Sequence, residues 1–206
     1  MSSISIIGSG NMARAIGARA VKGGNAVEVI SRDAAKADAL AKTLGGGTTT
    51  GKFGAVPAGD IVILAVPHTG AVPVVARYGD ALAGKVIIDI TNPFNADATG
   101  LVTPDGTSGA QEVAKAAPAS AHVVKAFNTV FGHVLAEGLP LDVLIAGDDV
   151  QAKASASAFI GSLGLRPLDT GDLAMAHWLE GVALLLMGLA RHGVGFNFNL
   201  GVNVSG

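Results

Sequence analysis

Two glycines and an alanine near the start of the chain have the spacing of a phosphate-binding turn. Gly8 and Gly10 follow the apolar run at residues 4–7, and Ala13 stands where a helix is expected to begin. In a Gly-x-Gly-x-x-Ala pattern the first glycine permits a tight turn and the second lets a pyrophosphate approach the backbone. The spacing predicts a dinucleotide-binding turn whose contacts come from Gly8, Ser9, Gly10, Asn11 and Met12. The alternative is a glycine-rich turn without a ligand.

The end of the second expected strand, residues 26–31, carries the side chains that would select between NAD and NADP. NAD enzymes usually place an acidic residue at this point to accept hydrogen bonds from the ribose. This chain has Ser31 followed by Arg32, and Lys36 comes one helical turn later. A hydroxyl group and two cations suit a 2′-phosphate, which a guanidinium can hold through paired hydrogen bonds. The pattern predicts NADP(H). The alternative is a solvated helix start with Asp33 near its cap.

Strands and helices alternate along the chain, which would bring such side chains to one edge of a sheet. Strand-like runs cover residues 4–7, 26–31, 48–50, 60–66, 85–90, 122–126, 142–146 and 165–168, and all but the short threonine run at 48–50 are largely apolar. The alternation predicts an α/β fold of Rossmann type, with a doubly wound, mostly parallel sheet and a C-terminal helical extension. We expect an NADP-binding domain over residues 1–170. Residues 171–206 would form a helix and tail that complete the substrate pocket and a dimer interface.

Two further strands are expected to end in polar loops that contain proline. The strand at 60–66 runs into Pro67 and His68, and the strand at 85–90 is followed by Asn92. Ligands in open α/β sheets bind at the carboxyl ends of strands, so these loops should lie beside the nucleotide. The loop at 96–108 is rich in Gly, Thr and Asp, and we expect it to be mobile or to cover a substrate.

Composition excludes several classes of protein. The 206 residues are 50% hydrophobic and 15% charged, with a net charge of −2 and no cysteine. Without a basic tract we expect neither nucleic acid nor an anionic membrane as partner. Thiolate chemistry is excluded, and no grouping of His, Asp and Glu has metal-ligand spacing, so we expect no metal. The chain enters a strand at once and its longest apolar run, residues 182–190, is short for a bilayer. We expect a cytoplasmic protein, and the low charge favours a homodimer.

Five segments, in this order, resemble the coenzyme F420-dependent NADP oxidoreductase family over essentially the whole chain. They are Gly8–Ala13, Ser31–Arg32 with Lys36, Ala65–Pro67, Thr91–Pro93 and Val124–Thr129. The last segment is also similar to the cytosolic oxidoreductase domain of the STEAP metalloreductases, which carry a membrane domain as well.

The resemblance implies hydride exchange between NADP(H) and the deazaflavin coenzyme F420. It implies that the glycine turn holds the pyrophosphate and that the Ser-Arg and Lys positions hold the 2′-phosphate. It also implies that Val66, Pro67 and residues 126–128 flank the nicotinamide and the second ring. The residues expected to contact cofactors are Gly8, Ser9, Gly10, Asn11, Met12, Ser31, Arg32, Lys36, Ala65, Val66, Pro67, His68, Asn92, Ala126, Phe127 and Asn128.

No residue has a certain catalytic role, because hydride transfer between two flat rings mainly requires stacking, alignment and exclusion of water. If the acceptor takes up a proton, His68 and Asn128 are the candidates. His68 could instead be an exposed loop histidine, and Asn92 could stabilise a turn. Lys125 lies inside a strand, so its direction is open; we interpret it as a surface or interface lysine, with a catalytic role as the alternative.

Three rival functions stay open. One is an NADPH-dependent flavin reductase or ferric-flavin reductase that uses FMN or FAD. Another is an imine reductase, since the first turn also resembles pyrroline-5-carboxylate reductase. That family adds an all-helical dimer domain, whereas strands here are expected to continue to about residue 168. The third is a non-catalytic NADP(H)-sensing protein.

Overall fold

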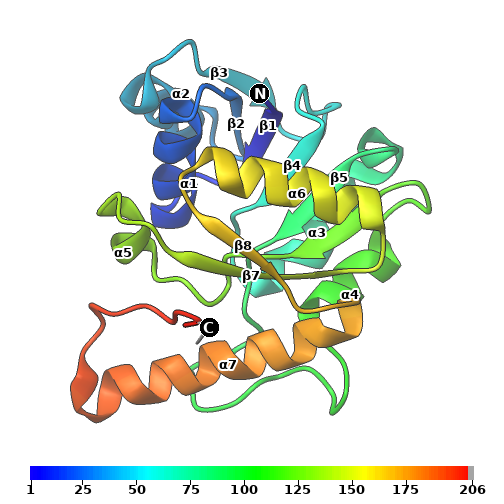
Figure 1. Cartoon of the computed structure of the whole chain (residues 1–206). Helices are drawn as coiled ribbons and strands as arrows, with labels where there is room; N and C mark the ends of the chain where they lie inside the picture. Colours follow the sequence, from blue (N-terminus) through cyan, green and yellow to red (C-terminus); the bar gives the residue numbers. More distant parts are fainter. Residues whose placement is uncertain (204–206) are drawn as a thin grey trace.

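The computed structural model describes residues 1–203, which form one eight-stranded sheet flanked by helices (Figure 1). The strand order is β3-β2-β1-β4-β5-β6-β7-β8. All neighbouring strands are parallel except β6 and β7, which are antiparallel. The strands are β1 (Ser3–Ile7), β2 (Ala26–Ser31), β3 (Thr49–Lys52), β4 (Ile61–Leu64), β5 (Val86–Asp89), β6 (His122–Lys125), β7 (Asp142–Gly147) and β8 (Arg166–Asp169). The predicted Rossmann-type, doubly wound sheet is confirmed.

The helices lie where the alternation of the sequence predicts them. They are α1 (Asn11–Lys22), α2 (Ala34–Leu44), α3 (His68–Tyr78), α4 (Gly109–Ala116), α5 (Gly132–Ala136), α6 (Val150–Ser162) and α7 (Ala176–Leu189). Short 3-10 turns follow α3 (η1, Gly79–Leu82) and precede α7 (η2, Leu173–Met175), and a π-helical turn ends the C-terminal helix (η3, Ala190–Val194). The side chains of Asp33, Ser108 and Asp149 accept backbone N–H bonds and so cap α2, α4 and α6.

Two hydrophobic clusters, one on each face of the sheet, form the core. Helices α1, α2, α5 and α6 pack on one face, and α3, α4 and the start of α7 pack on the other. Successive β1 residues alternate between them, since Ile6 belongs to the first cluster and Ile7 to the second. The sheet is therefore covered on both faces, which leaves its carboxyl edge as the place for a ligand.

The C-terminal helical segment extends well beyond the apolar run at 182–190. Leu173–Val194 is helical apart from a kink at His192 and Gly193; its most apolar 18-residue window has a mean hydropathy of 1.6, and 39% of that window is buried. By length and composition alone this segment could cross a membrane. The apolar run at 182–190 is the second half of this segment, whose first half begins at Leu173. Within the fold, α7 packs against α4 and β7.

Candidate functional site

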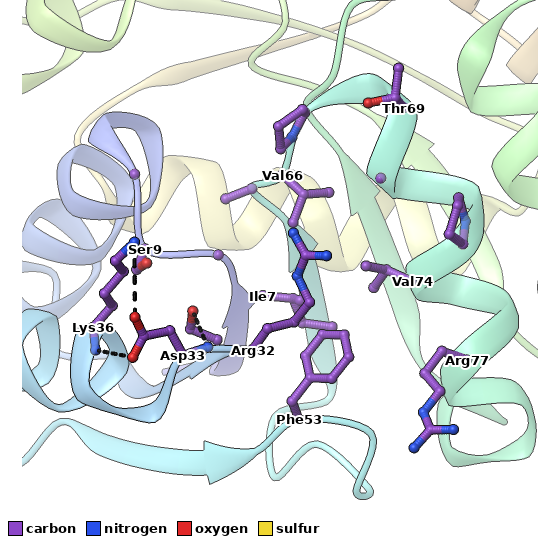
Figure 2. Close-up of a pocket in the computed structure, with 17 residues that line it drawn as sticks. Ile7, Ser9, Arg32, Asp33, Lys36, Phe53, Val66, Thr69, Val74 and Arg77 are labelled. Atoms are coloured by element: carbon purple, nitrogen blue, oxygen red, sulfur yellow. Dashed lines mark hydrogen bonds and ion pairs between the residues drawn. The ribbon is translucent and has the colours of Figure 1, made fainter.

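A cavity of about 690 Å³ opens where β1, β2 and β4 end (Figure 2). Its volume lies in the range of ligand pockets. Nine of the residues predicted to contact a cofactor line it. They are Gly8, Ser9, Gly10, Ser31, Arg32, Lys36, Ala65, Val66 and Pro67. The structure thus brings together the glycine turn, the end of β2 and the Val-Pro loop, which are separate in the sequence.

The two glycines of the turn are required for different reasons. Gly8 has a φ of +131°, and a Cβ there would lie 2.0 Å from the carbonyl oxygen of Ala65. The fold itself therefore excludes a side chain at this position. Gly10 has a φ of −83°, which any residue can adopt, and a Cβ there would meet no atom within 4 Å. Nothing in the protein's own packing requires glycine at position 10, whereas a pyrophosphate resting on the backbone would.

The cations at the end of β2 are available to a ligand. Within residues 1–203 the guanidinium of Arg32 forms neither an ion pair nor a hydrogen bond, and Figure 2 shows it directed into the cavity beside Val66. The ammonium of Lys36 lies 3.9 Å from the Asp33 carboxylate, and both side chains are more than half exposed. Asp33 caps α2 through the backbone N–H of Lys36. Capping of α2 by Asp33 is therefore compatible with phosphate binding, because Arg32 and Lys36 still line the cavity.

The opposite wall of the cavity was missed by the sequence analysis. Phe53 and Val74 provide apolar surface, and Arg77 adds a third cation at the far end of α3 (Figure 2). Phe53 is held edge-on to Tyr78, with ring centroids 5.5 Å apart. The spacing of Gly70, Pro73, Val74 and Arg77 marks one face of α3, which is the signal that could have identified this wall.

The other seven predicted contact residues do not line this cavity. Asn11 is exposed at the first turn of α1, and Met12 packs toward Gly132, where a Cβ would come within 3.0 Å of its sulfur. Ala126 and Phe127 are fully buried, and Asn128 is nearly so. His68 and Asn92 are partly buried. Their proposed contacts with the nicotinamide or the second ring stay predictions.

Asn92 and Asn128 join the loops that follow β5 and β6. The amide of Asn92 donates to the carbonyl oxygen of Asn128 at 2.8 Å, and the amide of Asn128 donates to the side-chain oxygen of Asn92 at 3.0 Å. The Asn128 amide also donates to the Leu179 carbonyl oxygen on α7 at 3.0 Å. These bonds engage every polar side-chain atom of the pair except the Asn128 oxygen, which is buried without a partner.

Phe127, in the loop that follows β6, has an unusual backbone conformation. Its φ is +60°, a left-handed value that is rare for a bulky residue, and its side chain is completely buried. Such a conformation costs of order 1–3 kcal/mol and persists only where the surroundings fix it. The packing of Phe127 and the Asn92–Asn128 bonds supply that constraint. This loop is therefore rigidly held rather than open.

The interpretation of Lys125 as a surface or interface lysine was wrong. Its ammonium is completely buried and donates to Asp89 at 2.8 Å, to Glu180 at 2.8 Å and to the Thr91 carbonyl oxygen at 2.5 Å. Both carboxylates are also fully buried. We call these three side chains the Lys125 cluster. Lys125 turns inward because α4 and α7 cover this face of the sheet, so that its charge must be paired there.

His68 begins α3 directly behind the Val-Pro loop, and it is not the exposed loop histidine of the alternative interpretation. Its Nδ1 atom is buried and has no hydrogen-bond partner within the described residues. A Cβ at Gly109 would lie 3.1 Å from that nitrogen and 3.4 Å from a Glu180 oxygen. A side chain at this position would be crowded between His68 and Glu180, which would have to move by a few tenths of an ångström. An unsatisfied buried nitrogen beside the site keeps His68 a candidate for a proton or ligand contact.

The C-terminal tail folds back on its own chain. Arg166 donates two hydrogen bonds of 2.6 Å to Asp142, and that carboxylate also accepts from the Val202 N–H at 2.7 Å. The guanidinium lowers the pKa of Asp142, and the carboxylate raises the pKa of Arg166. Nearer the site, His133 bonds to the Phe196 carbonyl oxygen, and the Phe196 and Phe198 rings pack edge-on to Phe131. The tail therefore lies over α5 and the β7–β8 edge.

Comparison with known proteins supports the predicted resemblance. Residues 3–93 match the protein family described as "NADP oxidoreductase coenzyme F420-dependent". The chain is 34% identical to the metalloreductase STEAP3 of Rattus norvegicus, over 89% of this chain and 37% of that protein. It is 30% identical to an F420-dependent NADP reductase of Methanocaldococcus jannaschii, over 64% of this chain and 62% of that enzyme. The resemblances to the F420-dependent family and to the STEAP metalloreductases are therefore confirmed.

A solved structure covers nearly the whole chain. A proposed F420-dependent NADP reductase from Arthrobacter sp. FB24 superposes with a TM-score of 0.85, over 99% of this chain and all of that one, at 21% identity. At this identity the likeness shows the fold. The α/β sheet and the C-terminal helical region are thus shared with this structure. The chain spans well under two thirds of STEAP3 and slightly under two thirds of the methanogen enzyme.

Proposed function

We propose that this protein is an NADPH-dependent oxidoreductase that transfers hydride between NADP(H) and a flat ring acceptor, and that the acceptor is the deazaflavin coenzyme F420. The observation that carries the proposal is the cavity at the ends of β1, β2 and β4. It combines a glycine that only a ligand requires, Gly10, with two cations, Arg32 and Lys36, that the protein's own acidic groups leave available.

In this proposal each part of the cavity binds one part of NADP(H). Ser9, Gly10 and the N-terminus of α1 bind the pyrophosphate through backbone N–H groups, since the Gly8 N–H already donates to the Ile30 carbonyl oxygen at 2.8 Å. Ser31, Arg32 and Lys36 bind the 2′-phosphate by charge-assisted hydrogen bonds. The wall of Phe53 and Val74 receives the adenine. When bound, NADPH supplies the hydride, and the residues of this chain bind it, orient it and exclude water.

The acceptor would bind on the side of β5 and β6, next to the nicotinamide. Support for a deazaflavin comes from the family match of residues 3–93 and from the methanogen relative. The expected flanking residues at 126–128 lie in a rigid, buried loop, so we propose that they shape the base of the acceptor site. His68, with its unpartnered nitrogen, is the group best suited to hold a proton for the acceptor.

A flavin or ferric-flavin reductase is the second candidate. The rat STEAP3 relative is more similar in sequence than the methanogen enzyme, and its name denotes reduction of a metal. Lys125 and Phe127 belong to the segment 124–129 that carries the STEAP resemblance. This candidate needs the same NADPH cavity and differs only in the second ring.

We propose further that residues 1–170 form the NADP-binding domain and that residues 171–206 complete the acceptor site and a homodimer interface. Trp178, Leu185 and Leu189 support the interface, because they are 50–69% exposed and lie along one face of α7. A cytoplasmic location fits with Glu180, through which the apolar helix is ion-paired to the sheet.

The proposal is tested by following NADPH absorbance with coenzyme F420, FMN, FAD and riboflavin in parallel reactions. NADH replaces NADPH in a matched set. Reduction of F420 with NADPH, and little turnover with NADH, is the expected result. Turnover of flavins alone would favour the second candidate. NADPH binding without turnover of any acceptor would contradict the enzymatic proposal and favour the NADP(H)-sensing alternative.

A further inference from the structure

We propose that the Lys125 cluster is a positioning unit: it clamps both ends of the loop at 92–108 and the helix α7 against the acceptor side of the site. The inference rests on the proposed function for its kinetic consequences. The cluster touches neither cavity nor solvent, since Lys125, Asp89 and Glu180 are all 0% exposed. It therefore acts through the segments that it holds.

Both ends of the loop are bound to the cluster by their backbones. At the start of the loop, the Thr91 carbonyl oxygen accepts from Lys125, and the Thr91 N–H donates to Asp89 at 3.0 Å. At its end, the Gly109 N–H donates to Glu180 at 3.1 Å. The ends of a long loop are thus closed by one set of charges. Such loops with tied ends are frequently functional.

The same helix also holds the body of the loop. His177 on α7 bonds to the Thr107 carbonyl oxygen at 2.9 Å, and Arg191 beyond its end donates to the carbonyl oxygens of Asp97 and Ala98. The loop at 96–108, which the sequence analysis expected to be mobile or to cover a substrate, is thus hydrogen-bonded to the C-terminal helix at two places. Because Asn92 at the loop's start pairs with Asn128, the clamp extends to the segment behind the proposed acceptor.

The chemistry of the cluster suits positioning better than stability. Burying two carboxylates and one ammonium costs solvation that their attraction only partly offsets, so an apolar cluster of the same shape would serve stability as well. Charged groups instead fix the relative positions of the elements that they join, because their hydrogen bonds are directional. The two oxygens of Glu180 accept from different elements, Lys125 on β6 and Gly109 on α4. A side-chain amide cannot do both, because it presents one oxygen and one NH₂ group.

Glu180→Gln is therefore the variant that tests the clamp, with the exposed Glu137→Gln as matched control. Hydrogen exchange of residues 92–108 should speed up about tenfold or more in Glu180→Gln alone. The kcat/KM for the acceptor should fall about tenfold to hundredfold, through both kcat and KM. The Kd for NADPH should stay within about twofold, because its cavity lies on other strands.

Unchanged exchange in the loop, or an NADPH affinity that falls as much as acceptor turnover, would overturn the proposal. If Glu180→Gln does not fold, His177→Phe releases the loop outside the cluster and should change loop exchange and acceptor kinetics in the same direction, to a smaller extent. No effect of that variant on either readout would also overturn it. Hydrogen exchange and NADPH binding need no acceptor, so failure of the proposed reaction would be seen separately from failure of the clamp.

Discussion

At the end of β2 the charged side chains stand in an open cavity, whereas at the ends of β5 and β6 they bind one another. Arg32 has no partner in the described residues and Lys36 only a distant one at 3.9 Å. Lys125 has three partners within 2.8 Å, and its two carboxylates are as deeply buried as it is. The cations at the end of β2 are therefore free to bind an anionic ligand, as we propose, whereas the charges at the ends of β5 and β6 are already paired within the protein.

The glycines make the same distinction within a single turn. Gly8 is required by the protein's own packing, because a side chain there would collide with Ala65. A Cβ at Gly10 would meet no atom of the described residues within 4 Å, so the requirement for glycine that we propose there comes from the ligand. The groups and the space that the protein's own contacts leave free, rather than residue type, therefore mark the side where we propose that the nucleotide binds. Mutations in the cavity at the end of β2 should change nucleotide affinity but not stability. Mutations in the Lys125 cluster should change stability or turnover but not nucleotide affinity.

The largest expected effect is on stability. Lys125→Met leaves two buried carboxyl groups without their cation, and breaking such a cluster should cost about 3–5 kcal/mol of unfolding free energy. Urea denaturation measures this. Lys115→Met, at an exposed position of α4, is the control and should change stability by less than about 0.5 kcal/mol. A loss of similar size in both variants would remove the contrast between the regions.

Gly10→Ala should weaken nucleotide binding without lowering the stability of the fold. The φ at this position suits alanine and no atom is displaced, so the urea midpoint should match or exceed that of the wild type. The added methyl group occupies the place of the pyrophosphate and should weaken NADPH binding about tenfold or more. Gly8→Ala is the counterpart, since its clash with Ala65 should destabilise the fold itself. Unaltered NADPH affinity in Gly10→Ala would show that no phosphate rests on this turn.

Lys36→Ala sharpens the comparison between NADPH and NADH. The ammonium is mostly exposed, so its loss should weaken NADPH binding by about 1 kcal/mol, or about fivefold, and leave NADH binding unchanged. Raising the ionic strength should reduce this difference. Lys42→Ala, near the other end of α2 and outside the cavity, should have no effect on either nucleotide. Isothermal titration calorimetry gives all the affinities.

The smallest expected effect concerns the C-terminal tail. Hydrogen bonding to Arg166 lowers the pKa of Asp142, so its stabilising contribution is complete above about pH 4 and is lost as the pH falls through the lowered value. Asp142→Asn should therefore lower the thermal midpoint slightly at neutral pH, with the gap to wild type closing in acid. Asp38→Asn, at an exposed position of α2, should show no such gap. A gap that widens below pH 4 would contradict the assignment.

The sequence predicted the open region well because its signals are local. The glycine spacing, the strand end at Ser31 and the cations beside it lie within 30 residues, and each belongs to one turn or one helix start. The fold class followed for the same reason, since alternation of apolar runs requires no knowledge of distant contacts.

The closed region could not be predicted because its partners are far apart in the sequence. Lys125 meets Asp89 across 36 positions and Glu180 across 55. A strand covered on both faces gives no pattern that tells which way a lysine points. Phe127 adopts a left-handed conformation that its residue type disfavours, and Arg77 reaches the cavity only through the packing of α3.

The most direct test of this account is the affinity of wild type and Arg32→Ala for NADPH and NADH, measured by calorimetry at one salt concentration. Arg14→Ala, exposed on α1 and outside the cavity, is the control. The account predicts that Arg32→Ala loses about 1.5–3 kcal/mol of NADPH binding, roughly tenfold to over a hundredfold, with NADH binding nearly unchanged. Equal losses for both nucleotides, or none for NADPH, would contradict the assignment of the open cations to the 2′-phosphate.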